Sequence, residues 1–520
     1  MAGESRKLYS NSTPSQLAFA ALRRSSDRIV LQDGSRSWTA AAALDCIATI
    51  QFHLEHKDCL PGGRIAVLSG NRPETWLIGV AVQGLGMCVS YLHPLGNLQS
   101  HIHQIDDFQP DVVIVDATRF PDIFADLSTR YAGQIAFLTL DGGTFGQSVL
   151  DRGLAGSQTV VDRSRPDDMA QINYTGGTTG RAKGAWRTNS SLAGSVVGAL
   201  SDFELPRAPA YLAAGPISHV AGTKILPSLL RGGRVVMVDR FDPELLCETI
   251  ARERISMTVL VPTMIYGLLD SSAIARHDLT SLELLLYGAS PMSVPRLEQG
   301  LERLGPVFSQ LYGQTECYPI AVLPREDHDP QFPDRLTACG YPSHSCSIAL
   351  LDPEGNRVTE GESGEICVRS PYIMGGYWRQ LELTEAALAG GWLHTGDVGR
   401  FDEQGRLYIV DRIKDLIITG GFNVYPREVE DVIAAVPGVA ISAVVGVPDP
   451  KWGEAVVAAV VAKPGARLDP LAIMSAVKAA RGPVYAPKKV RIVDTLPLTA
   501  AGKVDKNVLK ELHSDLWAEG

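Results

Sequence analysis

The sequence predicts an α/β protein: a large N-terminal domain of two doubly wound α/β subdomains plus a small β-barrel, followed by a small mobile α+β domain. Short apolar strands, such as residues 64–68 and 110–116, alternate with helical segments, which is typical of parallel sheets covered on both faces. At about 335–410 the sequence pattern changes to short strands with glycine-rich turns. Because 520 residues exceed one typical core, we expect a large domain over 1–413 and a small one over 414–520.

The two predicted α/β subdomains follow each other along the chain as two blocks of strands and helices. Residues 14–56 predict helices around a short strand, and a turn at Asp33-Gly34 follows that strand. The second block repeats apolar strands and helices, including a helix over 294–304 with leucines on one face. Ligands bind outside the carboxyl ends of the strands in such sheets, so 287–290 and 311–316, which follow strands, should lie at a binding edge.

The last part of the chain predicts a compact α+β unit. A helix is expected over 428–436, with apolar residues on one face and acids in its first turn. Strands are expected over 441–447 and 455–461.

Composition excludes some classes of function. The chain has 48 basic and 58 acidic residues, and its net charge of −10 argues against broad nucleic-acid binding. Eight scattered cysteines without a Cys-x-x-Cys pair indicate free thiols in a reducing compartment. No signal peptide and no apolar run of membrane-spanning length is evident, so a cytoplasmic protein is expected. The sequence leaves the oligomeric state, including a homodimer, open.

A glycine- and threonine-rich segment over 174–184 is the strongest local signal. Glycines leave backbone N–H groups bare and allow positive φ, so the segment can fold into an anion-binding nest. Threonine hydroxyls add donors, and Lys183 adds a positive charge. The spacing is that of neither the common P-loop nor a dinucleotide fingerprint. Phosphate binding is therefore predicted, and a flexible surface loop is the alternative.

Four later motifs occur in order with this loop. They are Leu311-Tyr312-Gly313-Gln314-Thr315-Glu316, Leu393-His394-Thr395-Gly396-Asp397, Asp411-Arg412-Ile413-Lys414-Asp415 and Pro497-Leu498-Thr499-Ala500-Ala501-Gly502-Lys503. With the loop, they resemble the adenylate-forming superfamily, in its acyl-CoA synthetase and aryl-CoA ligase branch. Two positions depart from the family loop: Gly176 stands where serine is usual, and Ala182 where proline is usual.

The resemblance implies a set of nucleotide-binding residues. The loop residues that would hold the ATP phosphates are Thr175, Gly176, Gly177, Thr178, Thr179, Gly180 and Lys183, with Thr178 also catalytic. The adenine and ribose side would be formed by Gly288, Ala289, Ser290, Tyr312, Gly313, Thr315, Asp397 and Arg412. Glu316 would bind Mg²⁺ and act in catalysis. Taken alone, Glu316 fits a solvated loop acid, Asp397 a turn cap, and Arg412 an ion pair with Asp411 or Asp415.

Lys503 is the main catalytic candidate. A carboxylate that attacks the α-phosphate meets another anion, and charge builds on the phosphorus oxygens. A lysine bridging the two groups would stabilise that charge, which is the role the resemblance implies for Lys503. The alternative is an ordinary solvated lysine. In the first reading the small domain acts as a lid that closes over ATP.

The candidates for binding the acyl group lie in the second α/β block. The resemblance puts His219 at the mouth of the acyl pocket as a catalytic and substrate residue, and the other substrate positions are Val220, Ala221, Lys224, Leu311 and Tyr318. Lys224 has two readings. Either its ammonium binds a polar group on the substrate, or its stem packs against apolar neighbours while the ammonium reaches water.

The resemblance also implies a coenzyme A site and a hinge. Trp452 would stack on the adenine of coenzyme A, and Gly420 and Gly421 would let the pantetheine chain pass close to the backbone. Lys414 would be the hinge about which the small domain turns between two half-reactions.

The predicted function is that of an ATP-dependent, AMP-forming carboxylate–CoA ligase with Mg²⁺ and coenzyme A, acting through an acyl-adenylate on a small carboxylic acid. Two alternatives remain open. One is a freestanding adenylating enzyme that loads a carrier-protein phosphopantetheine, and the other is a non-catalytic nucleotide sensor. The sequence does not identify the acid.

Overall fold

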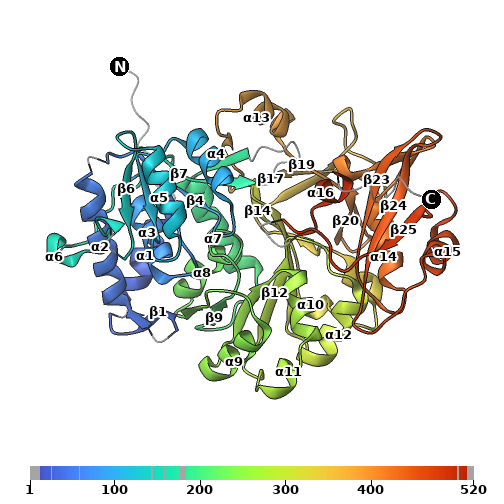
Figure 1. Ribbon diagram of the computed structural model, residues 1–520, viewed down its shortest axis with the longest axis horizontal. Helices are drawn as coiled ribbons and strands as arrows, with labels where there is room; N and C mark the ends of the chain where they lie inside the picture. The colour runs from blue at the N-terminus through green and yellow to red at the C-terminus, as the bar shows by residue number, and fades with distance from the viewer. Residues whose placement is uncertain are drawn as a thin grey trace.

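The computed structural model of the chain is shown in Figure 1. It describes residues 12–24, 26–34, 36–57, 59–141, 145–156, 158–175, 183–499 and 503–511. In these ranges, no helix combines the length and the hydropathy that a membrane crossing requires.

The first sheet has seven strands in the order β18-β8-β7-β4-β3-β5-β6. They are β3 (Arg64–Leu68), β4 (Cys88–Leu92), β5 (Val112–Val115), β6 (Ala136–Thr139), β7 (Met169–Thr175), β8 (Lys183–Thr188) and β18 (Gly376–Tyr377). Strands β3 to β6 pair in parallel, and every residue of β5 is buried. The carboxyl ends of these strands therefore share one edge, as the sequence predicted for this block.

The second sheet has nine strands in the order β15-β14-β13-β12-β11-β9-β10-β1-β2. They are β1 (Ile29–Asp33), β2 (Arg36–Thr39), β9 (Ala210–Ala213), β10 (Arg234–Met237), β11 (Met257–Leu260), β12 (Leu284–Gly288), β13 (Phe308–Gln314), β14 (Cys317–Leu323) and β15 (Tyr341–Pro342). The N-terminal strand β1 pairs in parallel with β10, with Leu31 opposite Val235. The start of the chain thus completes the second sheet, not the first.

Helices fill three layers around these two sheets (Figure 1). The helices are α1 (Pro14–Arg23), α2 (Ala40–Glu55), α3 (Pro73–Gly84), α4 (Leu98–Phe108), α5 (Pro121–Arg130), α6 (Arg152–Ala155), α7 (Asn189–Asp202), α8 (Ile225–Leu230), α9 (Pro243–Glu253), α10 (Pro262–Asp270), α11 (Ala273–Arg276) and α12 (Val294–Leu304). A large core joins α1, α2, α3, α7 and α8 to one face of each sheet. Separate cores lie under α4 and α5 on the first sheet and under α9 to α12 on the second.

The rest of the chain forms two smaller sheets. The four-stranded antiparallel sheet consists of β16 (Ser347–Leu351), β17 (Gly364–Arg369), β19 (Leu393–Phe401) and β20 (Leu407–Arg412), with α13 (Leu381–Ala387) before β19. The C-terminal unit contains β21 (Ile417–Thr419), β22 (Phe422–Val424), α14 (Pro426–Ala434), β23 (Val439–Asp449), β24 (Gly453–Ala462), α15 (Pro470–Arg481), β25 (Lys489–Ile492) and α16 (Lys506–Glu511). This unit, orange to red in Figure 1, has its own core. The predicted fold class is confirmed.

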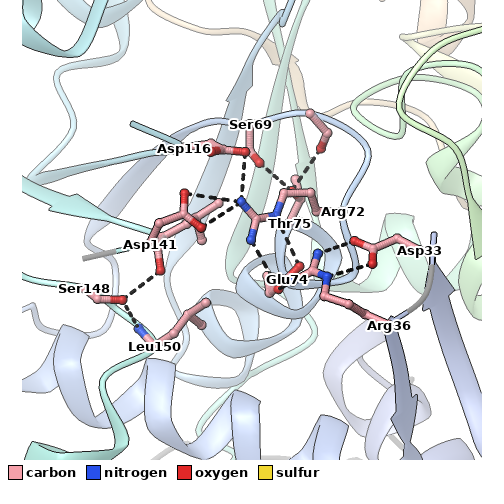
Figure 2. Close-up of polar contacts among 12 residues, drawn as sticks. Asp33, Arg36, Ser69, Arg72, Glu74, Thr75, Asp116, Asp141, Ser148 and Leu150 are labelled. Atoms are coloured by element: carbon pink, nitrogen blue, oxygen red, sulfur yellow. Dashed lines mark hydrogen bonds and ion pairs between the residues drawn. The ribbon is translucent and has the colours of Figure 1, made fainter. Parts of the chain in front are cut away.

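A network of ion pairs, buried at Glu74 and Asp116, lies where the first sheet meets the β1–β2 pair (Figure 2). Arg72 Nη1 lies 3.1 Å from Asp116 Oδ2 and 3.0 Å from Asp141 Oδ1. Arg72 Nη2 lies 3.4 Å from Glu74 Oε1, which Arg36 Nη1 also contacts at 2.7 Å. Burial alone would lower the pKa of Arg72, but Glu74 and Asp116 raise it above the usual value. The network is therefore held together by opposite charges.

Candidate active site

Asp397 is the centre of a buried hydrogen-bonded cluster. It lies in β19 opposite Arg412 in β20, and only 3% of its surface is exposed. Its Oδ2 accepts from Tyr312 Oη at 2.7 Å and from Gln314 Nε2 at 2.8 Å. Arg412 Nε lies 3.1 Å from Asp397 Oδ1. Asp397 is therefore not a solvated turn cap, and the guanidinium of Arg412 pairs with Asp397, not with Asp411.

Glu316 lies between β13 and β14 beside an aromatic side chain. Tyr377 Oη donates to Glu316 Oε1 at 2.8 Å. The ammonium of Lys183, at the start of β8, lies 5.3 Å from the centre of the Tyr377 ring. A carboxylate offers about four lone-pair sites, so one hydrogen bond leaves Glu316 able to bind a hard cation such as Mg²⁺. Tyr377 thus connects the candidate metal ligand with the lysine that ends the phosphate loop.

Most of the predicted phosphate loop lies outside the described residues. This applies to Gly176, Gly177, Thr178, Thr179 and Gly180. Thr175 is the last residue of β7 and Lys183 is the first residue of β8, and the two strands pair in antiparallel fashion. The described strands therefore bracket the loop at the edge of the first sheet.

Lys503 brings the C-terminal unit to this cluster. Its backbone N–H donates to Thr499 Oγ1 at 3.2 Å, and its carbonyl accepts from Thr499 N at 2.7 Å. The pKa of Lys503 is lowered to about 8, mainly by burial and also by the charge of Arg412, while Asp397 and Glu316 act in the opposite direction. These influences mean that the ammonium lies within electrostatic reach of both carboxylates, although it forms no ion pair with the described residues.

His219 also lies within electrostatic reach of Lys503. Its ring is 4.7 Å from that of His93, centre to centre, at an interplanar angle of 74°. Solvent reaches His219, yet the pKa of its imidazole is lowered to about 4, mainly by burial and also by His93 and Lys503. The imidazole of His219 is therefore neutral at neutral pH. Lys503 lies near both this ring and the two carboxylates.

Asn71 fixes the loop that carries His219. Its Nδ2 donates to the carbonyls of Gly215 at 2.7 Å and Val238 at 3.1 Å, and its Oδ1 accepts from Ile217 N at 3.0 Å. Asn71 follows β3 of the first sheet, whereas the loop follows β9 of the second. One buried side chain therefore sets the position of the His219 segment relative to both sheets.

The predicted acyl-binding residues gather in the large core between the sheets. Ala221, Leu311 and Tyr318 are 2%, 3% and 7% exposed, and Val220 packs against the same core. A Cβ on Gly313 would lie 2.8 Å from Tyr318 Cδ2, so glycine is needed for this close approach. These residues share one core, and their role in binding the acyl group stays a prediction.

The turn after β12 supports β13 closely. A Cβ on Gly288 would lie 2.2 Å from the carbonyl oxygen of Leu311, so only glycine fits there. Ala289 has a φ of 68°, in the left-handed region that non-glycine residues rarely adopt. Ser290 and Thr315 are partly exposed beside these strands. The segment therefore lies next to β13, which carries Tyr312.

The predicted coenzyme A residues form a separate group on the C-terminal unit. Gly420 N donates to Trp452 O at 2.7 Å, and Gly420 and Gly421 both have positive φ. The ammonium groups of Lys451 and Lys488 lie 4.8 and 5.2 Å from the centre of the Trp452 ring. No hydrogen bond, ion pair or ring contact within the described ranges joins this group to Asp397 or Glu316.

Lys414 lies at the junction between the four-stranded sheet and the C-terminal unit. It is exposed, in the single turn Ile413–Asp415 that connects β20 to β21. Partial burial and the charge of Arg412 lower the pKa of Lys414. Its position is the one expected of a hinge between the two units.

Sequence reasoning missed four residues of the site. Gln314 was readable, since it lies inside the motif of Tyr312 and Glu316. His93 and Asn71 come shortly after buried strands, which is the usual signal of a residue at the binding edge of a parallel sheet. Tyr377 gave no signal, because it reaches Glu316 through long-range pairings, of β18 with β8 and of Met374 N with the carbonyl of Glu316.

Comparison with known proteins gives consistent matches. The sequence models of the AMP-binding enzyme family and of the AMP-binding enzyme C-terminal domain match residues 18–378 and 428–503. A medium/long-chain-fatty-acid–CoA ligase of Mycobacterium tuberculosis is 39% identical over 95% of this chain and 89% of its own length. A feruloyl-CoA synthase of Amycolatopsis is 32% identical over 94% of this chain and 96% of its own.

A solved structure supports the same assignment. The amide bond synthetase of Marinactinospora thermotolerans superposes with a TM-score of 0.89 and 32% identity, covering 96% of this chain and all of its own. Since the first family model spans more than half of the chain, and relatives above 30% identity span nearly all of it, the chain belongs to the AMP-binding enzyme family, as the five ordered motifs predicted.

Proposed function

We propose that this protein joins a carboxylic acid to coenzyme A in two steps, with Lys503 assisting the first. The predicted activity, an ATP-dependent and AMP-forming carboxylate–CoA ligase, is confirmed by the family and by the curated relatives. In the first step the carboxylate attacks the α-phosphate, giving an acyl-adenylate and pyrophosphate. In the second the coenzyme A thiol attacks the acyl carbon and AMP leaves.

The observation that supports the role of Lys503 is the set of groups near it. It comes from the C-terminal unit, yet it lies within electrostatic reach of Asp397, Glu316 and His219. A cation there faces both the nucleotide and the acyl carboxylate, whose mutual repulsion it offsets. Fixed charges that meet charge developing in the transition state are among the strongest contributions to catalysis.

The other predicted nucleotide-binding residues have separate roles. Asp397, oriented by Tyr312 and Gln314, accepts hydrogen bonds from the ribose hydroxyls, and Arg412 contacts ribose or phosphate. Tyr312 stacks on adenine beside the turn of Gly288, Ala289 and Ser290. Glu316 holds Mg²⁺, which neutralises phosphate charge when bound. The phosphates lie against the loop over 175–180 and Lys183.

The other assignments also stand as proposals. Residues 1–413 form the ATP- and acyl-binding domain, and 414–520 form a lid that turns about Lys414 to bring Gly420, Gly421 and Trp452 to coenzyme A. Lys414→Pro fixes φ at this residue and should slow thioester formation about tenfold more than adenylation. Equal loss in both half-reactions would contradict the hinge. A cytoplasmic location, a homodimer and the lack of nucleic-acid binding stay predictions.

A panel of carboxylic acids tests the proposal. The protein is incubated with ATP, Mg²⁺ and each acid, with coenzyme A, with a phosphopantetheinylated carrier protein, or with neither, and AMP and acyl products are measured. Acyl-CoA formed with free coenzyme A is the expected result. Acyl transfer to the carrier protein alone would favour the first alternative, and ATP binding without AMP from any acid would favour the sensor. The names of the relatives make fatty and aryl acids the first members of the panel.

A further inference from the structure

Lys224 is a completely buried lysine beside the predicted acyl-binding residues. It precedes α8, and 0% of its surface is exposed. The reading in which its ammonium reaches water is therefore wrong. Burial lowers the pKa of Lys224 well below its usual value of 10.5. A lysine is rarely buried without a group that accepts its hydrogen bonds.

Neutral groups surround the Lys224 amine. Its Nζ donates to Thr223 Oγ1 at 2.8 Å and also to Tyr318 Oη. The centres of the Phe203 and Tyr318 rings lie 4.8 and 4.4 Å from Nζ. Among the residues that the structure describes, no carboxylate pairs with Lys224. The surroundings therefore compensate the amine only in part.

The contacts of the amine lead to the acyl-binding residues. Tyr318 packs against Gly313 and belongs to the same core as Leu311 and Ala221. Thr223 is exposed, and its hydroxyl donates to the carbonyl of Val220 at 2.7 Å. Because the Thr223 proton is used in this way, its oxygen is free to accept from Lys224. The amine thus lies directly behind Thr223, which is exposed, and behind Tyr318, which belongs to the predicted acyl-binding residues.

A plain apolar acyl group offers no hydrogen-bond acceptor to the Lys224 amine. A methionine of similar length would fill the space without burying a polar group. In either protonation state, however, the amine carries N–H donors, and an oxygen acceptor on a bound acid would satisfy them. A second carboxylate would in addition supply the missing counter-charge.

We propose that Lys224 and Tyr318 form a recognition site for an oxygen acceptor on the acyl group, a carbonyl or a second carboxylate remote from the reacting end. The proposal rests on the ligase activity above and specifies its substrate class. Both residues act on binding, not on the reacting atoms. Their loss should therefore appear mainly in KM, at about tenfold to a hundredfold, the worth of one hydrogen bond to a charged group.

The test uses matched pairs of acids. Each pair has the same chain length or ring, and one member carries a keto group or second carboxylate at the far end. Wild-type enzyme, Lys224→Met, Tyr318→Phe and the exposed control Lys57→Met are compared by AMP release, with kcat and KM measured for each acid. Wild type and Lys57→Met should prefer the oxygen-bearing member. Lys224→Met should lose that preference through a higher KM and should gain activity on the plain member.

The outcomes separate the two proposals. If wild type prefers plain acids and Lys224→Met leaves the ratio of kcat/KM unchanged, the recognition site is wrong while the ligase activity stands. If wild type forms AMP from no acid of either kind, the ligase proposal itself fails. If Lys224→Met does not fold, judged by the loss of a cooperative urea transition, the ratio measured for Tyr318→Phe decides, since that change removes only the hydroxyl.

Discussion

Arg72 and Lys224 are both basic side chains inside the large N-terminal part, but their surroundings differ. Arg72, whose side chain is 17% exposed, lies among the carboxylates of Glu74, Asp116 and Asp141 (Figure 2). Lys224, fully buried, contacts two hydroxyls and two aromatic rings. The pKa of Arg72 is raised and that of Lys224 is lowered, because burial is outweighed only where carboxylates stand close.

This difference separates structural from ligand-directed charge. The charge of Arg72 is matched by carboxylates of the protein itself, so removing Arg72 leaves the buried carboxylate of Asp116 uncompensated. Lys224, and Lys503 in the candidate active site, lack a protein counter-ion within the described ranges. A charge that the fold leaves uncompensated costs stability unless a bound ligand completes it, which is the usual pattern at functional sites.

Arg72→Met should have the largest effect on stability. It leaves Asp116 buried without its cation and Glu74 with Arg36 alone, which lowers the free energy of unfolding by about 3–5 kcal/mol. Urea denaturation measures it. Arg36→Met is the matched control, because the Arg36 side chain is 47% exposed and its ion pairs should contribute no more than about 1 kcal/mol. Equal losses in the two variants would remove the contrast on which the comparison depends.

Lys503→Ala should have the largest effect on chemistry. Adenylation, followed by acid-dependent exchange of pyrophosphate into ATP, should fall about 10²- to 10³-fold, because one preorganised charge is lost. Thioester formation from supplied acyl-adenylate should stay close to wild type, and so should the urea midpoint. A parallel fall in both half-reactions would instead indicate damage to the fold.

The pH dependence of adenylation should sharpen the assignment of Lys503. Its pKa of about 8 reflects burial together with Arg412 and Lys414, opposed by Asp397 and Glu316. Only the protonated amine offsets phosphate charge, so kcat/KM should fall above pH 8, about tenfold per unit. Lys503→Arg should abolish this alkaline limb, because arginine stays charged. A limb that persists in the arginine variant would assign it to another group.

The same titration affects stability in a defined direction. The unfolded chain holds the Lys503 proton up to its usual pKa of 10.5, whereas the folded protein releases it at about 8. Between these values the unfolded state binds more protons, so the contribution of this group to stability rises with pH. Below pH 8 its full cost is present.

Lys224→Met should have the smallest effect on stability. Replacing a buried charge that has no counter-ion by an apolar side chain of similar length should leave the free energy of unfolding unchanged or raise it by about 1 kcal/mol. Urea denaturation beside Arg72→Met gives the direct contrast. A loss as large as that of Arg72→Met would mean that Lys224 is a structural cation after all.

The sequence predicted which side chains belong to the site better than which side chains touch. Ordered motifs named Asp397, Arg412 and Glu316, because loops at strand ends carry recognisable residue types. The partner of Arg412 was not among the alternatives considered, since it depends on the register of β19 and β20. Whether the Lys224 amine is buried likewise depends on Phe203 and Tyr318, which are distant in sequence.

The sequence also did not predict which sheet each strand belongs to. The strand at Ile29–Asp33 was expected, but its parallel partner begins at Arg234, some two hundred residues later. Local pattern fixes whether a segment is a strand, whereas the choice of a parallel neighbour depends on the packing of the helices between them.

That pairing has a consequence for how the chain is made. Residues 29–33 leave the ribosome long before Arg234–Met237 exist, and synthesis at about 5–20 residues per second separates the two by about 10–40 s. Val30 and Leu31, both 0% exposed in the finished protein, have only the neighbouring strand β2 to pair with during that time, and their partner β10 is missing. The nascent N-terminus must therefore wait, exposed or held by a chaperone, while the first sheet assembles without it. Variants that slow translation before residue 237 should lengthen this interval.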